Sequence, residues 1–190
     1  MMTKPPLILA SSSPRRRQLL TEAGYDFTVL PPRDDAEDAA GQGEGALSLV
    51  RRLALQKARD VASRCDSGLI LGCDTVAEID GEILGKPADR SDARRMLAQL
   101  RGREHRVFSG LCLWRRPDDQ HRVEIDATRL IMDEISDADL DQYLDSGQWE
   151  GKAGAFGYRD GIDWVHILEG SESNVVGLPM ELLARLLGDF

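Results

Sequence analysis

The stretch from Leu7 to Leu20 reads LILASSSPRRRQLL and predicts a short buried strand that runs directly into a helix. Residues 7–10 are apolar, Ser13 is a favourable N-cap, and Pro14 suits the first helical position, where its missing N–H is not needed. Three arginines follow in the first turn, at the helix end that already carries partial positive charge. A bound anion would resolve this conflict. An ordinary strand–helix unit with solvated arginines explains the same residues, and both interpretations stay open.

The length of the chain, 190 residues, suits one domain with a sizeable core, and no linker or repeat divides it. Residues 1–190 are therefore predicted to form a single domain. The net charge of -9 and the pI of about 4.9 argue against general binding to nucleic acid or to an anionic membrane, because both need a basic surface. We expect no nucleic-acid or membrane partner, although a local basic cleft could still bind a small anion.

The three cysteines, Cys65, Cys73 and Cys112, are widely spaced and form no CxxC motif, so neither a disulfide framework nor a zinc site is predicted. A reducing compartment suits this pattern. The apolar run at the N-terminus is too short for a signal peptide, and no later segment reaches the length of a membrane span. The expected location is the cytoplasm.

Hydrophobic periodicity and turn signals predict alternating helices and strands along the rest of the chain. The expected strands are 7–10, 27–30, 69–71, 106–114, 123–132 and 162–168, with a hairpin at Asp80-Gly81 and a turn at 170–174. The first expected helix begins at Pro14 and ends near Gly24. The other expected helices are 46–63, 92–100 with Ser91 as its cap, one from Ser136 to near Gly147, and 179–187. This order predicts an α/β fold in which a mixed sheet is flanked by helices.

Two charged residues occupy positions that favour a functional site. Lys57 shares the apolar face of helix 46–63, so it either reaches out to solvent or points its ammonium into a cleft. Asp74 follows the apolar run 69–71, at a position where α/β proteins commonly carry catalytic or metal-binding carboxylates. The later segment Gly85-Lys86-Pro87 is not a P-loop, because the glycine spacing is too short and proline replaces the metal-binding Ser or Thr.

Several cations and one carboxylate together indicate phosphoryl chemistry, in which cationic groups bind phosphates and an acid holds a metal or orients water. These residues are Arg15, Arg16, Lys57, Lys86, Lys152 and Asp74. The histidines His105, His121 and His166 are isolated on strand-like segments and are interpreted as structural. The sequence alone does not show that the cations converge in space.

Four segments closely resemble motifs of the Maf family of nucleoside triphosphate pyrophosphatases. They are SSSPRRRQLL (11–20), GCDTVAEIDGEILGKP (72–87), GKAGAFG (151–157) and SNVVGLP (173–179), in the order found in that family. The resemblance implies an inosine-triphosphatase-like fold, with a long mixed central sheet and two lobes around a nucleotide cleft. It also implies hydrolysis between the α and β phosphates with a divalent metal, Mg²⁺ or Mn²⁺, in the removal of non-standard nucleotides (house-cleaning).

The resemblance assigns roles to several residues of the phosphate site. Ser11, Arg15 and Arg16 match the phosphate-binding motif of the family, and Lys57 and Lys86 match its two phosphate-binding lysines. These matches favour the interpretation in which the lysine on the apolar face points into a cleft.

The resemblance also assigns the acid chemistry. Asp74 matches the residue that serves as catalytic base or metal ligand, and Thr75 is expected beside it. We expect a metal to supply much of the activation of water, since a carboxylate with a reference pKa of about 4 is a weak base. Asp35 is the expected second metal contact, but Ala36 follows it where the family has another acid, and Glu37 could replace that acid.

The nucleotide preference is predicted from the glycine-rich segment. The match from Lys152 to Gly157 resembles the branch of the family that acts on dTTP and UTP, but Arg159 stands where that branch has glutamine. Arginine lacks the acceptor of an amide, so the base preference could be relaxed or altered. Relatives are often dimers, which suggests a homodimer. The alternative function is a non-catalytic nucleotide-binding regulator of cell division and septum formation.

Overall fold

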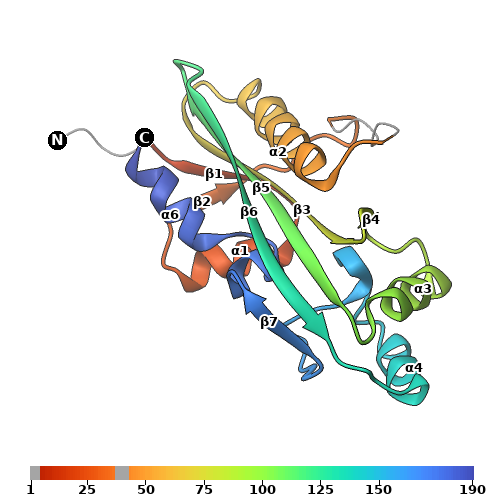
Figure 1. Ribbon diagram of the computed structural model, residues 1–190. Helices are drawn as coiled ribbons and strands as arrows, with labels where there is room; N and C mark the ends of the chain where they lie inside the picture. The colour runs from red at the N-terminus through yellow and green to blue at the C-terminus, as the bar shows by residue number, and fades with distance from the viewer. Residues whose placement is uncertain (1–4, 37–42) are drawn as a thin grey trace.

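The computed structural model describes residues 5–36 and 43–190 and contains a long seven-stranded sheet flanked by helices (Figure 1). In chain order the elements are β1 (Leu7–Ala10), α1 (Pro14–Glu22), β2 (Phe27–Val29), α2 (Ala46–Ala62), β3 (Gly68–Ile79), β4 (Glu82–Leu84), α3 (Arg90–Leu100), β5 (Glu104–Arg116), β6 (His121–Met132), α4 (Asp137–Asp145), the 3₁₀ turn η1 (Ala153–Ala155), β7 (Val165–Glu169), α5 (Glu172–Val176) and α6 (Met180–Gly188). The predicted mixed sheet flanked by helices is confirmed.

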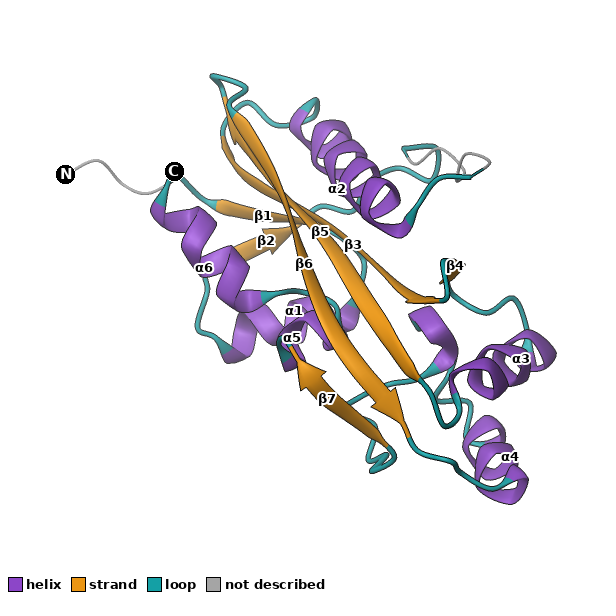
Figure 2. Cartoon of the chain, in the orientation of Figure 1, coloured by secondary structure: helices purple, strands orange, loops and turns teal. Residues whose placement is uncertain are grey.

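The sheet combines a short parallel part with a long antiparallel part. The strand order is β2-β1-β3-β5-β6-β7, and β4 pairs with β3 beside this path. β1 runs parallel to β2 and β3, whereas the remaining pairs are antiparallel. β3, β5 and β6 contain 12, 13 and 12 residues. At about 3.3 Å per residue each is roughly 40 Å long, so these three strands extend through most of the molecule (Figure 2).

Alternate residues in the first half of the sheet face two different helical layers. Leu9, Leu69 and Leu71 pack in one apolar cluster with leucines of α1 and α6. Ile8 and Ile70 face the opposite way and pack with alanines of α2. This arrangement follows from the two-residue period of a strand. Because both faces are covered, the strands read as continuous apolar runs in the sequence.

A separate apolar cluster lies at the other end of the long strands. Here Ala77 and Ile79 of β3 pack with Leu97 of α3 and Leu140 of α4. β3 therefore contributes its first half to one cluster and its second half to another, with Asp74 between them. The molecule has two lobes that share the same long strands, as the resemblance implies.

Helix α2 lies very close to the sheet because two glycines leave room for its backbone. A Cβ atom on Gly72 of β3 would lie 2.3 Å from the Ala54 carbonyl oxygen, and one on Gly110 of β5 would lie 2.1 Å from the Val50 carbonyl oxygen. Any side chain at these two positions would push the helix away. The glycines thus seat the buried face of α2 directly over the middle of β3.

The structure corrects the prediction that the strand after residues 69–71 gives way at Asp74. β3 continues to Ile79, because its antiparallel partner β5 remains paired with it as far as Glu78. The parallel ladder is what ends nearby: Ala10, the last residue of β1, pairs with Gly72. Asp74 therefore lies in the middle of a strand, just beyond the point where the neighbouring strand stops.

Two further predictions, one of a helix start and one of a turn, also change. Asp89, rather than Ser91, caps α3, and its Oδ1 accepts a hydrogen bond from the Asp92 N–H at 2.8 Å. Both residue types are strong caps, so the sequence offered two starts within three residues. The segment 170–174, predicted as a turn, contains the start of α5, which Ser171 caps.

Other predictions are confirmed. The helix expected over 46–63 is α2, and Ser136 caps α4 as expected. Asp80 and Gly81 both adopt positive φ in the tight hairpin between β3 and β4. Of the described residues, no helix combines the length and the apolar character needed to cross a bilayer.

Candidate active site

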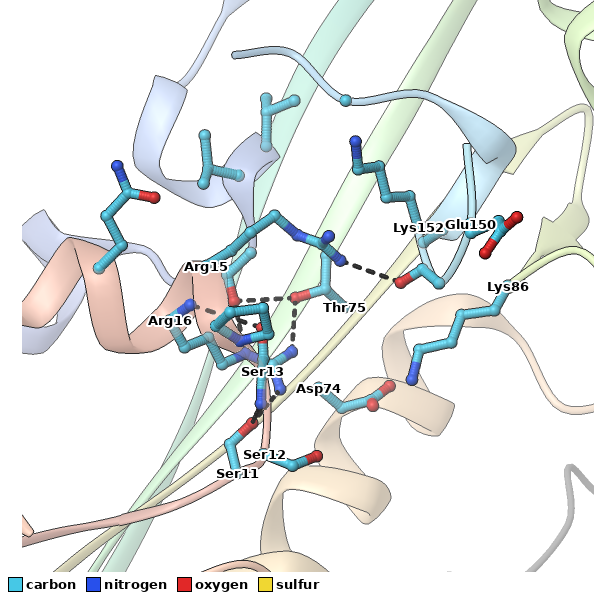
Figure 3. Close-up of a pocket in the computed structure, with 18 of the residues that line it drawn as sticks. Ser11, Ser12, Ser13, Arg15, Arg16, Asp74, Thr75, Lys86, Glu150 and Lys152 are labelled. Atoms are coloured by element: carbon cyan, nitrogen blue, oxygen red, sulfur yellow. Dashed lines mark hydrogen bonds between the residues drawn. The ribbon is translucent and has the colours of Figure 1, made fainter. Parts of the chain in front are cut away.

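A cavity of about 740 Å³ opens beside β3, at the point where β1 ends (Figure 3). Its wall combines the β1–α1 elbow, α2, β3, the glycine-rich loop 150–160 and the segment after α5. The following predicted site residues line it: Ser11, Arg15, Arg16, Lys57, Asp74, Thr75, Lys86, Lys152 and Arg159. The structure therefore brings together side chains that are far apart in the sequence.

The β1–α1 elbow forms one end of the cavity. The Ser13 Oγ accepts a hydrogen bond from the Arg16 N–H at 3.4 Å and so caps α1. The Ser11 Oγ accepts bonds from the Ser13 N–H at 3.2 Å and from Arg16 Nη1 at 3.1 Å. The first turn of α1 contains no acidic residue. Nothing within that turn neutralises its arginines and the positive end of the helix, which favours an anion there.

Arg16 is held by three separate segments of the chain. Besides Ser11, its Nε donates to the Gly177 carbonyl at 2.8 Å and its Nη2 donates to Thr75 Oγ1 at 3.3 Å. Thr75 Oγ1 in turn lies 2.8 Å from Ser109 Oγ and donates to the Gly177 carbonyl at 3.2 Å. A guanidinium has five N–H donors. These bonds fix its orientation while leaving donors for an anion in the cavity.

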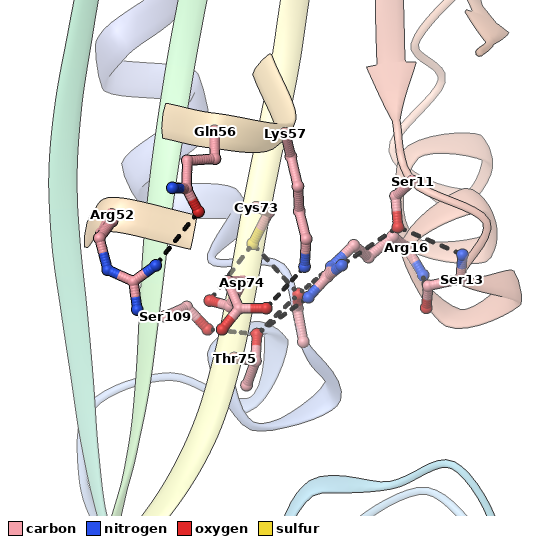
Figure 4. A network of polar contacts seen from close by, with 11 residues as sticks. Ser11, Ser13, Arg16, Arg52, Gln56, Lys57, Cys73, Asp74, Thr75 and Ser109 are labelled. Carbon is pink, nitrogen blue, oxygen red and sulfur yellow. Dashed lines mark hydrogen bonds and ion pairs between the residues drawn. The ribbon is translucent and has the colours of Figure 1, made fainter. Parts of the chain in front are cut away.

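Lys57 and Asp74 form a buried ion pair between α2 and β3, with 2.6 Å from Nζ to Oδ1 (Figure 4). Each residue is only 8% exposed. The second carboxylate oxygen of Asp74, Oδ2, is buried and has no hydrogen-bond partner among the described residues. An unpaired buried carboxylate oxygen is destabilising. Its persistence in the cavity wall marks it as a place for a bound cation, a water molecule or a substrate group.

The fit of a divalent cation to this site rests on that same oxygen. In residues 5–36 and 43–190, no group of three or more His, Cys, Asp or Glu side chains could hold a metal without help. Mg²⁺, however, commonly takes one or two carboxylates and completes its ligands with substrate phosphates and water. Asp74 fits this second kind of site.

Asp35, the predicted second metal contact, does not line this cavity. It lines a smaller pocket together with Asp60, whereas its neighbour Asp34 lines the main cavity. The structure therefore does not bring Asp35 and Asp74 together, and a metal role for Asp35 stays a prediction. Glu37, which could replace the missing acid, lies outside the described residues.

Arg15 and Lys86 add cations to opposite sides of the cavity. Arg15 Nη2 donates to the Gly151 carbonyl at 3.0 Å and so links α1 to the glycine-rich loop. Burial and the neighbouring Arg16 lower the pKa of Arg15, although a guanidinium stays charged at neutral pH. Lys86 is exposed and extends into the cavity from the segment after β4 (Figure 3). Both cations can reach a polyanion that lies across the cavity.

Lys152 forms an ion pair with Asp160 across the glycine-rich loop. Burial and the nearby Arg15 guanidinium lower the pKa of Lys152 to about 8, so it is mostly charged at neutral pH. Gly157 lies against this pair, where a Cβ atom would collide with both side chains, and its N–H donates to the Tyr143 Oη at 3.1 Å. A side chain at this position would therefore displace the Lys152–Asp160 pair from its present place.

Arg159 is held at the rim of the cavity by two carboxylates. Its Nε donates to Glu172 Oε1 at 2.7 Å, and its Nη1 donates to Glu22 Oε2 at 2.8 Å. The hydrogen bond from Arg159 lowers the pKa of Glu22, which therefore stays ionised at neutral pH. These bonds tie the loop to α1 and α5.

The comparison with known proteins agrees with this geometry. A family model described as Maf-like protein matches residues 6–190. The chain belongs to the Maf family. A protein of Rhodopirellula baltica named dTTP/UTP pyrophosphatase is 55% identical over 97% of this Maf chain and 82% of its own length. A Dictyoglomus thermophilum protein of the same name is 40% identical over 97% of this chain and 95% of its own.

Some polar groups of this Maf site could not be identified from the sequence. Ser109 sits within an apolar strand, and Tyr143 and Asp160 belong to segments whose contacts with the loop depend on tertiary folding. Gly177 lies inside the SNVVGLP motif, which pointed to the segment but not to its carbonyl oxygen. A backbone acceptor carries no side-chain signal, so only the structure reveals it.

Proposed function

We propose that this Maf protein hydrolyses pyrimidine nucleoside triphosphates such as dTTP and UTP between the α and β phosphates. The products are the nucleoside monophosphate and pyrophosphate. The names of the related proteins support the substrate class. The observation that carries the proposal is the Asp74 carboxylate: Asp74 lines the cavity together with cations from several elements, and its buried Oδ2 has no hydrogen-bond partner among the described residues.

The cations are proposed to bind the triphosphate. Arg16 and Ser11 lie at the N-terminus of α1, where free donors and the helix dipole favour phosphate oxygens. Arg15 and Lys152 approach from the side of the glycine-rich loop, and Lys86 approaches from the segment after β4. Binding by several fixed donors would also hold the reacting phosphorus in place for attack by water.

Asp74 is the proposed catalytic residue. Lys57 pairs with Oδ1 and so orients the carboxylate, which leaves Oδ2 to position water or a cation. A divalent cation held by Asp74 and by phosphate oxygens would, when bound, neutralise charge and make water more acidic. Thr75, which follows Asp74 and bonds Arg16, would connect the water-activating group to the phosphate-binding group.

Arg159 is proposed to influence the base preference indirectly. Its guanidinium is bound by Glu22 and Glu172, so it is less available to read a base than the glutamine it replaces. The resemblance further suggests a house-cleaning role in the cytoplasm, and this role would suit the proposed activity.

The test is an incubation of the purified chain with each standard nucleoside triphosphate and Mg²⁺ or Mn²⁺, followed by separation of the products. We expect monophosphate and pyrophosphate in equal amounts, formed fastest from dTTP or UTP, and loss of activity in EDTA. Formation of diphosphate and orthophosphate would contradict the proposed cleavage. Tight binding without turnover for every base and metal would favour the non-catalytic regulator. A higher metal requirement in Asp35→Asn would support its predicted role.

A further inference from the structure

A buried polar anchor holds α5 on the sheet, outside the cavity. Asn174 is 0% exposed, and its Nδ2 donates to the Val107 carbonyl at 3.2 Å and to Thr128 Oγ1 at 2.9 Å. Val107 belongs to β5 and Thr128 to β6. A single side chain of this short helix is therefore bonded to two strands of the central sheet.

The Thr128 hydroxyl is the centre of this anchor. It donates to the Ser171 carbonyl at 3.2 Å, and it accepts from the Ser171 N–H at 3.2 Å and from Asn174. A hydroxyl has one donor and two acceptor sites, so all of its hydrogen-bonding capacity is used. Thr128 is 0% exposed and does not line the cavity. Its polar contacts thus serve α5 and not a ligand.

The other end of α5 delivers a carbonyl group to the site. Gly177 follows the helix directly, and its N–H donates to the Ser173 carbonyl at 3.1 Å. The Gly177 carbonyl oxygen accepts from Arg16 Nε at 2.8 Å and from Thr75 Oγ1 at 3.2 Å. α5 contains five residues, or about 8 Å of helix, so a shift at its anchored end is passed to this oxygen.

We propose that Thr128 and Asn174 are positioning residues for Arg16: they hold α5 so that the Gly177 carbonyl aims the guanidinium at the bound phosphates. The proposal rests on the proposed function, in which Arg16 binds phosphate. Loss of the anchor lets the Gly177 carbonyl move, and Arg16 then loses its bond at Nε. The guanidinium becomes less ordered, and nucleotide binding must restore that order at the expense of affinity.

A matched pair of variants separates positioning from general stability. Thr128→Val keeps the shape of the side chain and removes the hydroxyl, whereas Thr128→Ser keeps the hydroxyl. Each is made in the parent and in an Arg16→Ala background. Calorimetric titration with pyrophosphate measures affinity for the phosphate site without turnover, dTTP kinetics give KM and kcat, and thermal unfolding gives Tm.

We expect Thr128→Val to weaken pyrophosphate binding and to raise the KM for dTTP by about five- to tenfold, with a smaller change in kcat. Thr128→Ser should stay within about twofold of the parent, and Thr128→Val should add no further loss in the Arg16→Ala background. An equal loss with and without Arg16, or no loss at all, would overturn the positioning role. If Thr128→Val does not fold, Asn174→Ala cuts the same link and gives the same comparison. Parent-like pyrophosphate binding in Arg16→Ala alone would instead contradict the proposed phosphate site.

Discussion

At the residue scale, the buried Lys57–Asp74 ion pair adds little net stability to the fold, so its presence needs another explanation. Removing two charges from water is expensive, and well-packed apolar residues often replace such a pair without loss. The unpaired Asp74 Oδ2 adds a further penalty. The pair is therefore better explained by the role proposed for Asp74 than by a contribution to stability.

Asp74→Asn should lower turnover of dTTP by at least about 100-fold, because an amide can neither hold a cation nor accept a proton in the same way. Binding of pyrophosphate should persist, since the cations of the cavity are unchanged. The rate of product formation checks the first expectation, and calorimetric titration with pyrophosphate checks the second. Asp26→Asn, an exposed carboxylate outside the cavity, is the matched control and should leave turnover unchanged. Near-parental turnover in Asp74→Asn would remove Asp74 from its catalytic role.

His105 is a second buried polar residue, but its effect is on stability. It is 3% exposed and packs edge-on against Phe156, and its Nε2 has no hydrogen-bond partner among the described residues. Burial lowers the pKa of His105 from 6.5 to about 4. The unfolded state therefore binds a proton more readily than the folded state between these two values.

The free energy of unfolding should accordingly fall as pH drops from about 6.5 to about 4, by about 3 kcal/mol from this residue. Urea unfolding at a series of pH values measures this slope. His105→Phe should remove that part of the slope, because the new ring does not titrate. An unchanged slope in His105→Phe would refute the assignment.

Individual site residues could be predicted to different degrees. The sequence placed Arg15 and Arg16 at a helix N-terminus that already carries positive charge, and this local conflict pointed to an anion without any tertiary information. Lys57 was ambiguous, because a lysine on an apolar face can reach solvent as easily as a cleft. Its pairing with Asp74 joins two elements, and only the packing of α2 on β3 creates it.

At the element scale, the contact of α2 with the sheet positions one half of the Lys57–Asp74 ion pair. Gly110 lies opposite Asp74 in the β3–β5 register, and a Cβ there would lie 2.1 Å from the Val50 carbonyl oxygen. The helix that carries Lys57 therefore rests on a bare strand backbone, and the site depends on the absence of a side chain.

Gly110→Ala should lower the free energy of unfolding by about 1–3 kcal/mol, because the added methyl group must displace backbone atoms. It should also lower turnover of dTTP, since a shift of α2 moves Lys57 away from Asp74. Urea unfolding and dTTP kinetics measure the two effects. Gly188→Ala adds a methyl group in open space at the end of α6 and should change neither. Parent-like stability of Gly110→Ala would show that α2 can yield without strain.

Elements were predictable where periodicity or turn chemistry is local. The hairpin at Asp80-Gly81 and the helix α2 follow directly from such signals. The length of β3 was not predictable beyond the apolar run, since pairing with β5 extends it through polar residues. The start of α5 was missed for a related reason: a helix of five residues is too short for periodicity and depends on tertiary anchors.

At the scale of the whole molecule, contacts across the cavity join segments from both lobes. Arg159 on the glycine-rich loop bonds Glu22 of α1 and Glu172 of α5, and Arg15 of α1 bonds the Gly151 carbonyl. The Arg159 contacts are exposed ion pairs, which are individually weak and sensitive to salt. They are suited to holding the rim of the cavity without locking it.

Arg159→Ala, which removes both ion pairs without adding the base-reading amide of glutamine, should raise the KM for dTTP by roughly threefold at low salt, because the loop is no longer tied to both helices. The difference from the parent should disappear near 1 M NaCl, where screening weakens the same ion pairs in the parent. Steady-state kinetics over a salt series measure both effects. Arg159→Lys retains the charge but lacks the guanidinium, which can bond two carboxylates at once. Its KM for dTTP should lie between that of the parent and that of the first variant. A KM equal to that of the parent at low salt would show that these ion pairs do not hold the rim.

The whole-molecule features that could be predicted were those set by composition and motif order. The acidic net charge argued against nucleic acid as a partner, and the four motifs indicated the family that the comparison confirms. Apart from the resemblance to the family, the sequence did not predict that the two lobes meet at one cavity. This arrangement depends on the long strands β3 and β5, which contribute residues to both apolar clusters. A homodimer stays a prediction, since the structure contains one chain.

The continuity of β3 has a mechanical consequence. A hinge between two lobes needs a flexible connection, yet here the same strand, bonded to β5 over nearly its full length, belongs to the core of each lobe. The strand that carries Asp74 is thus a rigid connection between the two lobes and not a hinge. Any adaptation to a bound ligand would then fall to segments outside these strands, such as the glycine-rich loop, whose Arg159 is tied to α1 and α5 by exposed ion pairs. Substrate capture in this molecule would therefore involve movement of a peripheral loop over a rigid pair of strands, β3 and β5.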